Sequence, residues 1–322
     1  MNSDIHLDPR IAAVMGALVA DSAALGLHWL YDPDRIAHIE KTHGLVFLQP
    51  NPDHYADTKG YFAHGNKLSG DSSGYGELCL LMARHQARHR QFNRIEYQTE
   101  YQNYFGPGGA YVGYVDSPTR LTLQTLLPLK PADYPERSGA DDDQFSALST
   151  IPVVVAAHTG TQDALLEKIE QVVRLTNHNN DAVSAAQYIA IVLRKVLNGK
   201  SIQQALFHAL PLAGEKLSPL LKEALNAHTL DSLAIANRFG SACHVLEGIP
   251  VMAHIAQHAI NYRHAIEENI RIGGDSCGRA IMLGAIMAAR PSQPGVPGSA
   301  IPLEWLARYR KLSIAANACT IL

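Results

Sequence analysis

The sequence predicts an all-α protein, a single domain of packed helices. Apolar residues recur at three- and four-residue intervals, as in Leu165, Ile169, Val172 and Val173, which is the spacing of one buried helix face. Stretches of helical length rich in alanine and leucine follow one another along most of the chain. Alternating apolar and polar residues, the pattern of a half-buried strand, are scarce.

The expected helices can be placed in order along the chain. They cover 11–30, 75–88, 145–157, 163–175, 182–197, 201–210, 217–227, 250–260 and 279–289, and a short terminal helix is expected around Trp305. Only 44–48 and 151–155 resemble short strands. Pro152 and the alanines that follow it favour a buried helix for the second of these.

Composition indicates a large buried core and excludes some functions. Of the 322 residues, 47% are hydrophobic and only 18% are charged, so disorder is not expected. A net charge of -3 and a pI near 6.6 lack the basic signature of a nucleic-acid-binding protein. The helical pattern resumes after every irregular segment, which predicts one domain over 11–322 preceded by a polar tail over 1–10.

Cysteine usage and hydropathy favour a cytoplasmic protein. The four cysteines are scattered without a Cys-x-x-Cys pair, so neither a disulfide framework nor a thiolate zinc site is expected. The polar first ten residues do not resemble a signal peptide. The long apolar run 11–31 contains Asp21 and His28, and we interpret it as a buried helix rather than a membrane span.

Long irregular segments separate some of the helices. They are 45–68, the glycine- and tyrosine-rich 106–118, 130–143 with its three consecutive aspartates, and the proline-containing linker 291–302. Long loops within a compact domain are often functional. The tyrosines and phenylalanine between 101 and 114 could line a pocket, although packing against neighbouring helices explains them equally well.

Two short loops carry the strongest chemical signal. Ser69-Gly70-Asp71-Ser72-Ser73-Gly74 and Gly273-Gly274-Asp275-Ser276-Cys277-Gly278 each place an aspartate and hydroxyls beside glycines, directly before an expected helix. Carboxylate and hydroxyl oxygens suit Mg²⁺ or Mn²⁺. Alternatively, each aspartate merely caps its helix. We expect the two loops to meet in the fold and to form one site, although they lie far apart in the sequence.

Other candidate residues each have an ordinary structural alternative. His178 could contact a ligand or belong to an asparagine-rich turn between helices. The aspartates at 141–143 could bind a ribose or a cation, or simply form a solvated loop before a helix. Cys277 could be a reactive thiol or an inert buried cysteine. His28 could act in catalysis or lie in the core beside Trp29.

Taken in order, these segments resemble the ADP-ribosylglycohydrolase family, whose fold is all-α around a dinuclear metal site. The residues Gly16 to Gly26 resemble the first helix of that family, Ser69-Gly70-Asp71-Ser72 lies where the family has Thr-Asp-Asp-Thr, and Thr176-Asn177-His178 resembles its Thr-x-His segment. Gly273-Gly274-Asp275-Ser276-Cys277-Gly278 is similar to Gly-Gly-Asp-Thr-Asp-Thr. Leu27-His28-Trp29-Leu30 is similar to the branch that contains selenoprotein J and J-type crystallin.

The resemblance assigns a role to each candidate residue. It implies five metal ligands, which are Ser69, Asp71, Ser72, Asp275 and Ser276. It implies two catalytic groups, Asp71 and His28. The substrate contacts that it implies are Tyr75, Asp142, Asp143, His178 and Cys277. Gly70 and Cys277 stand where the family carries two further aspartates. Because those carboxylates are missing, we expect one Mg²⁺ or Mn²⁺ ion or none, rather than a dinuclear site.

The resemblance implies a hydrolase. The expected reaction is cleavage of a glycosidic bond in ADP-ribose, an ADP-ribosylated target or a related ribosyl compound, without nucleic-acid or membrane partners. The alternative is a non-catalytic protein of the same fold, either a crystallin-like scaffold or a nucleotide-binding pseudoenzyme.

Overall fold

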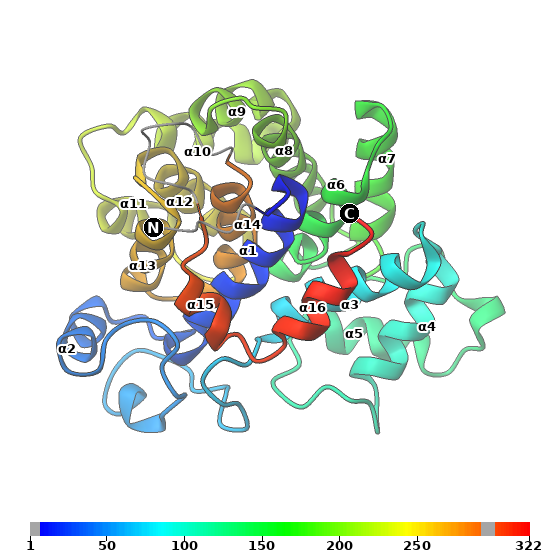
Figure 1. Ribbon diagram of the computed structural model, residues 1–322, viewed down its shortest axis with the longest axis horizontal. Helices are drawn as coiled ribbons and strands as arrows, with labels where there is room; N and C mark the ends of the chain where they lie inside the picture. Colours follow the sequence, from blue (N-terminus) through cyan, green and yellow to red (C-terminus); the bar gives the residue numbers. More distant parts are fainter. Residues whose placement is uncertain (1–6, 291–299) are drawn as a thin grey trace.

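A computed structural model describes residues 7–290 and 300–322, and these form helices joined by loops (Figure 1). The described residues contain no β-strand and only isolated β-bridges. This confirms the all-α prediction. The α-helices are α1 Pro9–Ala24, α2 Pro33–His43, α3 Gly74–His89, α4 Arg94–Phe105, α5 Ser117–Leu126, α6 Ile151–Ala157, α7 Gln162–Val173, α8 Asn180–Leu197, α9 Ile202–Ala209, α10 Gly214–Asn226, α11 Ser232–Phe239, α12 Val245–His258, α13 Tyr262–Ile272, α14 Ser276–Ala288, α15 Leu303–Arg308 and α16 Leu312–Cys319.

Helices α1 and α14 form the centre of the fold, with the other helices packed around them (Figure 1). Both are buried along almost their whole length. Small residues let the two backbones approach closely, since a Cβ added at Gly16 would overlap Gly284 and Ala288. The pair is antiparallel, so the end of α1 lies beside the start of α14. This arrangement brings His28 to Asp275.

Local sequence explains where most helices begin. Asp8, Asp32, Asn93, Asp116 and Asn179 each cap a helix by accepting a backbone N–H with the side chain. The expected helix over 145–157 is divided, because a 3₁₀ turn at Phe145–Leu148 precedes α6. The candidate strand 44–48 is irregular.

Several helices were not predicted. They are α2, α4, α5, α11, α13 and α16. Helix α4 has a polar mean hydropathy and buries tyrosine and glutamine side chains rather than aliphatic ones, so its sequence lacks an apolar stripe. The linker at 291–299 and the tail at 1–6 lie outside the described residues.

One helical segment, Pro9–Leu27, is long and apolar enough to cross a membrane by length and composition, but 89% of it is buried inside the protein. As a core helix, this segment packs its apolar surface against α14 and α3.

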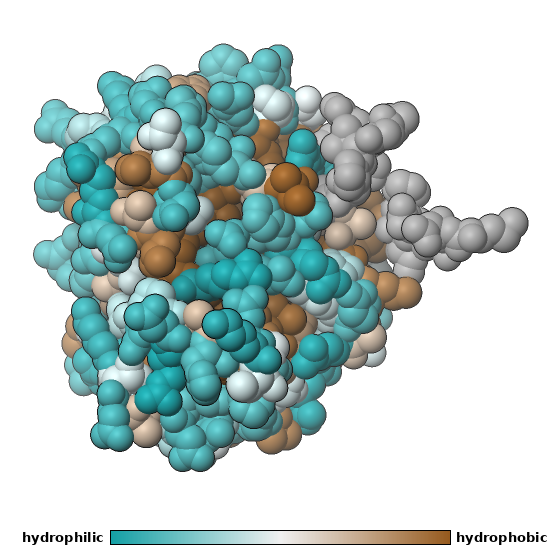
Figure 2. Space-filling view, turned by 90° about the vertical axis from the view of Figure 1, so that its left-hand side faces the viewer, coloured by the Kyte–Doolittle hydropathy of each residue, from teal (hydrophilic) through white to brown (hydrophobic). Residues whose placement is uncertain are grey.

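The face of the molecule formed by α2, α11 and α13 is mostly hydrophilic, with small separate apolar patches (Figure 2).

Candidate functional site

Two loops meet where α1 ends and α14 begins. The backbone N–H of Trp29 donates to the carbonyl of Gly274 over 2.8 Å, and the N–H of Gly274 donates to the carbonyl of Leu30 over 2.7 Å. Gly273 and Gly274 have φ of 77° and 66°, and a Cβ on either would overlap neighbouring backbone carbonyls. Glycines at both positions are therefore required for this close pairing, which fixes the position of Asp275.

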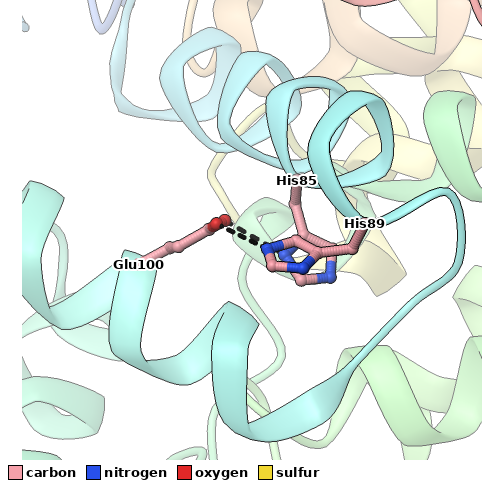
Figure 3. Close-up of side chains that lie close together, drawn as sticks. All are labelled: His85, His89 and Glu100. Carbon is pink, nitrogen blue, oxygen red and sulfur yellow. Dashed lines mark hydrogen bonds and ion pairs between the residues drawn. The ribbon is translucent and has the colours of Figure 1, made fainter.

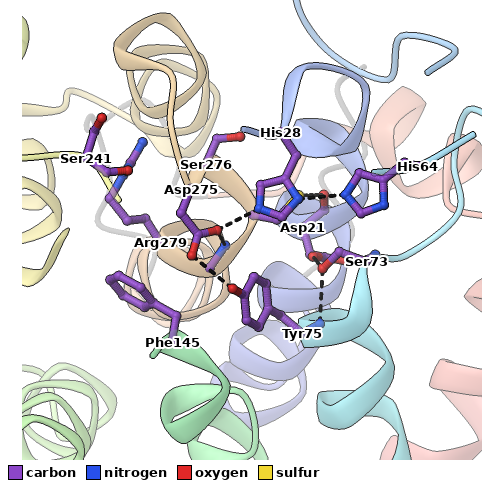
Figure 4. Close-up of polar contacts among 12 residues, drawn as sticks. Asp21, His28, His64, Ser73, Tyr75, Phe145, Ser241, Asp275, Ser276 and Arg279 are labelled. Atoms are coloured by element: carbon purple, nitrogen blue, oxygen red, sulfur yellow. Dashed lines mark hydrogen bonds and ion pairs between the residues drawn. The ribbon is translucent and has the colours of Figure 1, made fainter. Parts of the chain in front are cut away.

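The guanidinium of Arg279 holds the same loop from inside the core. It is fully buried and donates to the carbonyls of Ser241 and Gly273 and to the side chain of Asn269 (Figure 4). The N–H of Asp275 also donates to the carbonyl of Ser241 over 2.8 Å. Burial lowers the pKa of Arg279 to about 10, and the neighbouring carboxylate of Asp275 opposes that shift.

The carboxylate of Asp275 is the centre of a buried polar cluster. It accepts hydrogen bonds from His28 Nε2 at 2.7 Å, from the Tyr75 hydroxyl at 3.0 Å and from the Gly278 N–H at 2.9 Å (Figure 4). Burial alone would raise the pKa of Asp275, but the hydrogen bonds from His28 and from the N–H of Gly278, together with the charge of Arg279, outweigh it and lower that pKa. Asp275 is thus an ionised, hydrogen-bonded carboxylate within the core.

The cluster extends from His28 to a second histidine. His28 Nδ1 lies 2.7 Å from Nε2 of His64, and both rings are buried. Because the carboxylate of Asp275 only accepts, His28 carries a proton on Nε2. In the neutral form its Nδ1 then accepts from His64 Nε2–H, which leaves His64 Nδ1 as a free lone pair. That atom is buried and has no hydrogen-bond partner among the described residues.

Burial sets the protonation state of His64. Desolvation lowers the pKa of His64 well below its usual value, and the charge of Lys67 acts in the same direction. His64 is therefore neutral at physiological pH. The chain Asp275–His28–His64 presents a base at its end, oriented by a histidine and a carboxylate.

Asp21 belongs to a neighbouring buried contact between α1 and α3. Its carboxylate accepts the Ser73 N–H at 2.9 Å and also pairs with the Ser73 hydroxyl, while the same hydroxyl accepts the N–H of Tyr75 (Figure 4). Burial raises the pKa of Asp21 to about 7, although the hydrogen bonds from Ser73 act to lower it. Gly76 is needed here because a Cβ would overlap the carboxylate of Asp21.

A small cavity opens beside the histidines. Aromatic side chains form much of its wall, and Asp116, the cap of α5, adds a buried carboxyl group. The side chains that line it are His28, Trp29, His64, Tyr75, Phe105, Tyr111, Tyr114, Val115, Asp116 and Thr119, together with Gly74. Two of the residues that the sequence singled out, His28 and Tyr75, thus reach the cavity, and the aromatic segment between 101 and 114 contributes three further rings.

The contacts of Asp71 correct its expected placement. Its carboxylate pairs with Arg310 at 3.0 Å and accepts the N–H of Leu68 at 2.8 Å, and it does not line the cavity. The loop instead reaches the site four residues later, through Tyr75. The physical reason is the cap of α3: the helix begins at Gly74 with Ser73 as its cap, so the residues before Ser73 turn away toward the segment after α15.

The other predicted metal ligands do not converge either. The Ser69 hydroxyl donates to the carbonyl of Phe47, and Ser72 is buried beside Tyr309. Ser276 is buried next to Asp275. Asp275 itself is engaged by His28, Tyr75 and a backbone N–H. Asp71 and Ser72 are neighbours in one loop and Asp275 and Ser276 in the other. Because both aspartates are engaged by other groups, this set does not provide the converging free oxygens that Mg²⁺ requires.

Three of the predicted substrate contacts lie outside the lining of the cavity. Asp142 caps a turn by accepting from the N–H and side chain of Gln144, and Asp143 pairs with His244 at 2.6 Å. His178 is exposed, and its Nδ1 lies 3.1 Å from Arg174. None of the three lines the cavity. Whether they contact a substrate stays a prediction.

Cys277 is deeply buried. Its thiol lies 3.5 Å from the carbonyl of Asp21, and burial raises its pKa well above the usual value. It packs in the contact between α1 and α14 and does not line the cavity. A buried thiol of this kind is inert as a nucleophile.

A second cluster, His85, His89 and Glu100, has metal-ligand residue types close together (Figure 3). His85 Nε2 accepts the backbone N–H of Asn93 at 3.1 Å, so its proton lies on Nδ1 and donates to Glu100 at 3.0 Å. A neutral histidine that bound metal through Nδ1 would carry that proton on Nε2 instead, facing the Asn93 donor. Arg88 also pairs with Glu100. These contacts fit a hydrogen-bonded link between α3 and α4 rather than a metal site.

Sequence reasoning missed His64 and Asp116, and named Trp29 only as a neighbour of His28. Asp116-Ser117-Pro118-Thr119 is a recognisable helix start, with a capping aspartate followed by proline, and that signal could have predicted α5. His64 lies in an irregular loop, and no local pattern distinguishes it. Its role appears only when the fold brings it to His28.

The comparisons with known proteins agree with the fold. The sequence matches the model of the ADP-ribosylglycohydrolase family over residues 3–320, and the chain belongs to this family. It is 28% identical over 330 residues to Crystallin J1A and 25% identical over 327 residues to Crystallin J1B, both from Tripedalia cystophora. Each alignment covers 96% of this chain and 94% of the relative.

A solved structure shares the fold. It is described as an ADP-ribosylglycohydrolase-related protein complex, with a TM-score of 0.69 and 17% sequence identity. The match covers 97% of this chain and 95% of that one. The family resemblance and the similarity to J-type crystallin expected from the sequence are thus confirmed.

Proposed function

We propose that this protein hydrolyses a glycosidic bond of ADP-ribose or a related ribosyl compound, with the Asp275–His28–His64 chain as its catalytic base. Family membership supports the reaction class. The observation that carries the proposal is the free Nδ1 of His64, a buried lone pair at the end of a chain that begins with an ionised carboxylate.

The geometry suits activation of a water molecule. A water beside His64 Nδ1 would lose a proton to it as its oxygen attacks the anomeric carbon of the ribosyl group. His28 and Asp275 would orient the ring of His64 and stabilise the positive charge that it gains. The bond to the leaving group breaks as the new C–O bond forms, and the leaving group takes up the proton from solvent.

We further propose that the reaction needs no dinuclear metal centre. The carboxylates near the cavity already accept hydrogen bonds: Asp275 from three donors, Asp21 from Ser73, and Asp116 from the N–H of Thr119. Asp71 pairs with Arg310 outside it. The donor set of this chain therefore does not fit two cations, and no step of the proposed reaction depends on one.

The test is release of ADP-ribose from a panel of ADP-ribosylated proteins and small ribosyl compounds, with chelator and separately with Mg²⁺ or Mn²⁺. We expect turnover that chelator does not abolish, and a loss of about 100-fold in His64→Gln, which removes the base. Exposed His208→Gln, on α9 and outside the cavity lining, is the matched control and should retain most of the activity. Turnover in His64→Gln equal to wild type would contradict the mechanism.

A second candidate function is a non-catalytic scaffold, favoured by one specific observation. The similar curated proteins are named as crystallins. Such a protein would show no turnover on the whole panel under any metal condition, while remaining folded. That result would replace the hydrolase proposal with the scaffold.

A further inference from the structure

We propose that a second cavity, separate from the one beside His64, binds a small zwitterion of the class of a free amino acid. The anionic group of the ligand would lie at Lys59 and its ammonium group at Glu247. The two cavities share no lining residue among the described parts of the chain. The proposal is therefore independent of the hydrolysis proposed above, and its experiment measures binding without turnover.

The second cavity has a volume of about 300 Å³, which is the size of a site for a small molecule. Its lining comes from the starts of α2 and α12, the ends of α11 and α13, and two loops, on the side of the molecule where these helices lie together (Figure 1). The lining residues are Tyr31, Pro33, Lys59, Ala236, Asn237, Gly240, Ser241, Ala242, Glu247 and Ile272. Half of them carry polar side chains, so the cavity suits a polar ligand.

A short backbone pairing holds Lys59 beside Tyr31. The N–H of Tyr31 donates to the carbonyl of Lys59 at 2.8 Å, and the N–H of Tyr61 donates to the carbonyl of Trp29 at 2.9 Å. The Nζ of Lys59 lies 5.5 Å from the centroid of the Tyr31 ring. Among the described residues no carboxylate pairs with Lys59. Its ammonium group is therefore available to an anionic group in the cavity.

The carboxylate of Glu247 is held at another part of the lining. Its Oε2 accepts the N–H of Ala242 at 3.1 Å. It also lies against Gly240, which has a φ of 99° and where an added Cβ would overlap the carboxylate. Glycine at this position thus ends α11 and leaves room for the carboxylate. In the described parts of the chain, neither Lys59 nor another basic side chain forms an ion pair with Glu247.

The cavity therefore presents one basic and one acidic side chain that do not pair with each other. A zwitterion satisfies both, because its carboxylate accepts from Lys59 while its ammonium group donates to Glu247. Hydrogen bonds in which both groups are charged are stronger than neutral ones. A phosphate would face the carboxylate of Glu247, and a simple cation would face Lys59. A ligand of a single charge sign thus fits this lining less well.

Neutral polar groups in the same lining are available to the rest of the ligand. The hydroxyls of Tyr31 and Ser241 and the amide of Asn237 make no hydrogen bond among the described residues. Burial raises the pKa of Tyr31, and the charge of Asp275 adds to that shift, so the hydroxyl stays protonated and can donate. Ile272 and two alanines supply apolar surface for the carbon atoms of the ligand.

The experiment is a thermal-shift screen of the common L-amino acids on the full-length protein, followed by titration calorimetry of each one that raises the melting temperature. A ligand that binds the folded protein stabilises it. Each amino acid is compared with the matching amine, which lacks the carboxylate, and with the matching 2-hydroxy acid, which lacks the ammonium group.

We expect at least one amino acid to bind, and to bind about tenfold or more tightly than both counterparts, because each counterpart loses one charged hydrogen bond. A screen in which no amino acid raises the melting temperature would overturn the proposal. Equal affinity for either counterpart would also overturn it, since the site would then recognise a single charge.

Two variants assign the binding to this cavity. Lys59→Met removes the ammonium group, and Glu247→Gln removes the charge but retains an oxygen for the N–H of Ala242. We expect each to weaken the amino acid about tenfold, with the amine unaffected by Lys59→Met and the hydroxy acid unaffected by Glu247→Gln. Lys200→Met and Glu215→Gln, both exposed and outside the lining, are the matched controls and should bind like wild type. Wild-type affinity in either cavity variant would contradict the assignment of the charges and overturn the proposal.

Discussion

At the scale of single residues, the buried carboxyl groups of Asp275 and Asp21 differ because their donors differ. Asp275 faces His28, a group that can carry positive charge, and Arg279 lies behind it. Asp21 has only the hydroxyl and N–H of Ser73, with Glu77 nearby. Desolvation therefore dominates at Asp21, whereas pairing dominates at Asp275.

Asp21 predicts a pH dependence of stability. The pKa of an unfolded aspartate is 3.8 and that of folded Asp21 is about 7, so the folded protein holds this proton more tightly. The resulting stability is fully present below about pH 4 and falls as pH rises toward about 7. The side chain of Asp21→Asn cannot ionise, so the melting temperature of this variant should depend less on pH over that window.

Melting temperature measured from pH 4 to 7 checks this expectation, with the exposed Asp53→Asn as control. The control should keep the wild-type slope. The same slope in Asp21→Asn as in wild type would mean that this carboxyl group does not titrate in the window.

At the scale of elements, the site depends on how closely α1 and α14 pack. The ends of these helices carry His28 and Asp275, and their separation is set by the glycines and alanines along the contact. The meeting of these two helix ends could be predicted from sequence, because the motifs at 16–26 and 273–278 are local. The place of Asp71 could not be predicted, although the start of α3 was, because Asp71 pairs with Arg310, a partner far along the chain that no local pattern indicates.

Gly284→Ala tests the close approach of the two helices. A Cβ at Gly284 would overlap the backbone of Gly16 and the side chain of Ala20, so the helices must separate. We expect a loss of about 1–3 kcal/mol in the free energy of unfolding, measured with urea. Gly65→Ala, in an exposed loop with only a ring edge of Phe62 nearby, should change stability far less. Equal effects of the two substitutions would argue against the packing explanation.

At the scale of the whole molecule, the last helices connect the C-terminal part of the chain to α3. Lys311 pairs with both oxygens of Glu77 at 2.6 and 2.7 Å, and the Tyr104 hydroxyl donates to the same carboxylate at 2.6 Å. Glu77 is buried, whereas Lys311 is partly exposed. The pair thus fixes α16, α3 and α4 together. Its partners lie over two hundred residues apart, so sequence alone could not predict it.

Lys311→Met tests this connection. It leaves the buried carboxylate of Glu77 without its cation, and we expect a loss of about 2 kcal/mol in the free energy of unfolding, because partial exposure of Lys311 reduces the full cost of an unpaired buried charge. Glu77→Gln should reduce the free energy of unfolding by less at neutral pH, since it removes the buried charge itself. Urea unfolding of both variants measures the two losses in the free energy of unfolding. Lys311→Met as stable as wild type would show that the pair does not hold these helices.

The measurement that tests the central claim most directly is ribosyl hydrolysis, in chelator, by wild type, Asp275→Asn and Asp71→Asn. The claim is that Asp275, not Asp71, anchors the catalytic chain. Asp275→Asn should lose about 100-fold or more in kcat, because His28 and His64 lose their ionised partner. Asp71→Asn should keep most of the activity, since its carboxylate pairs with Arg310 away from the cavity. Full activity in Asp275→Asn, or loss confined to Asp71→Asn, would contradict the account.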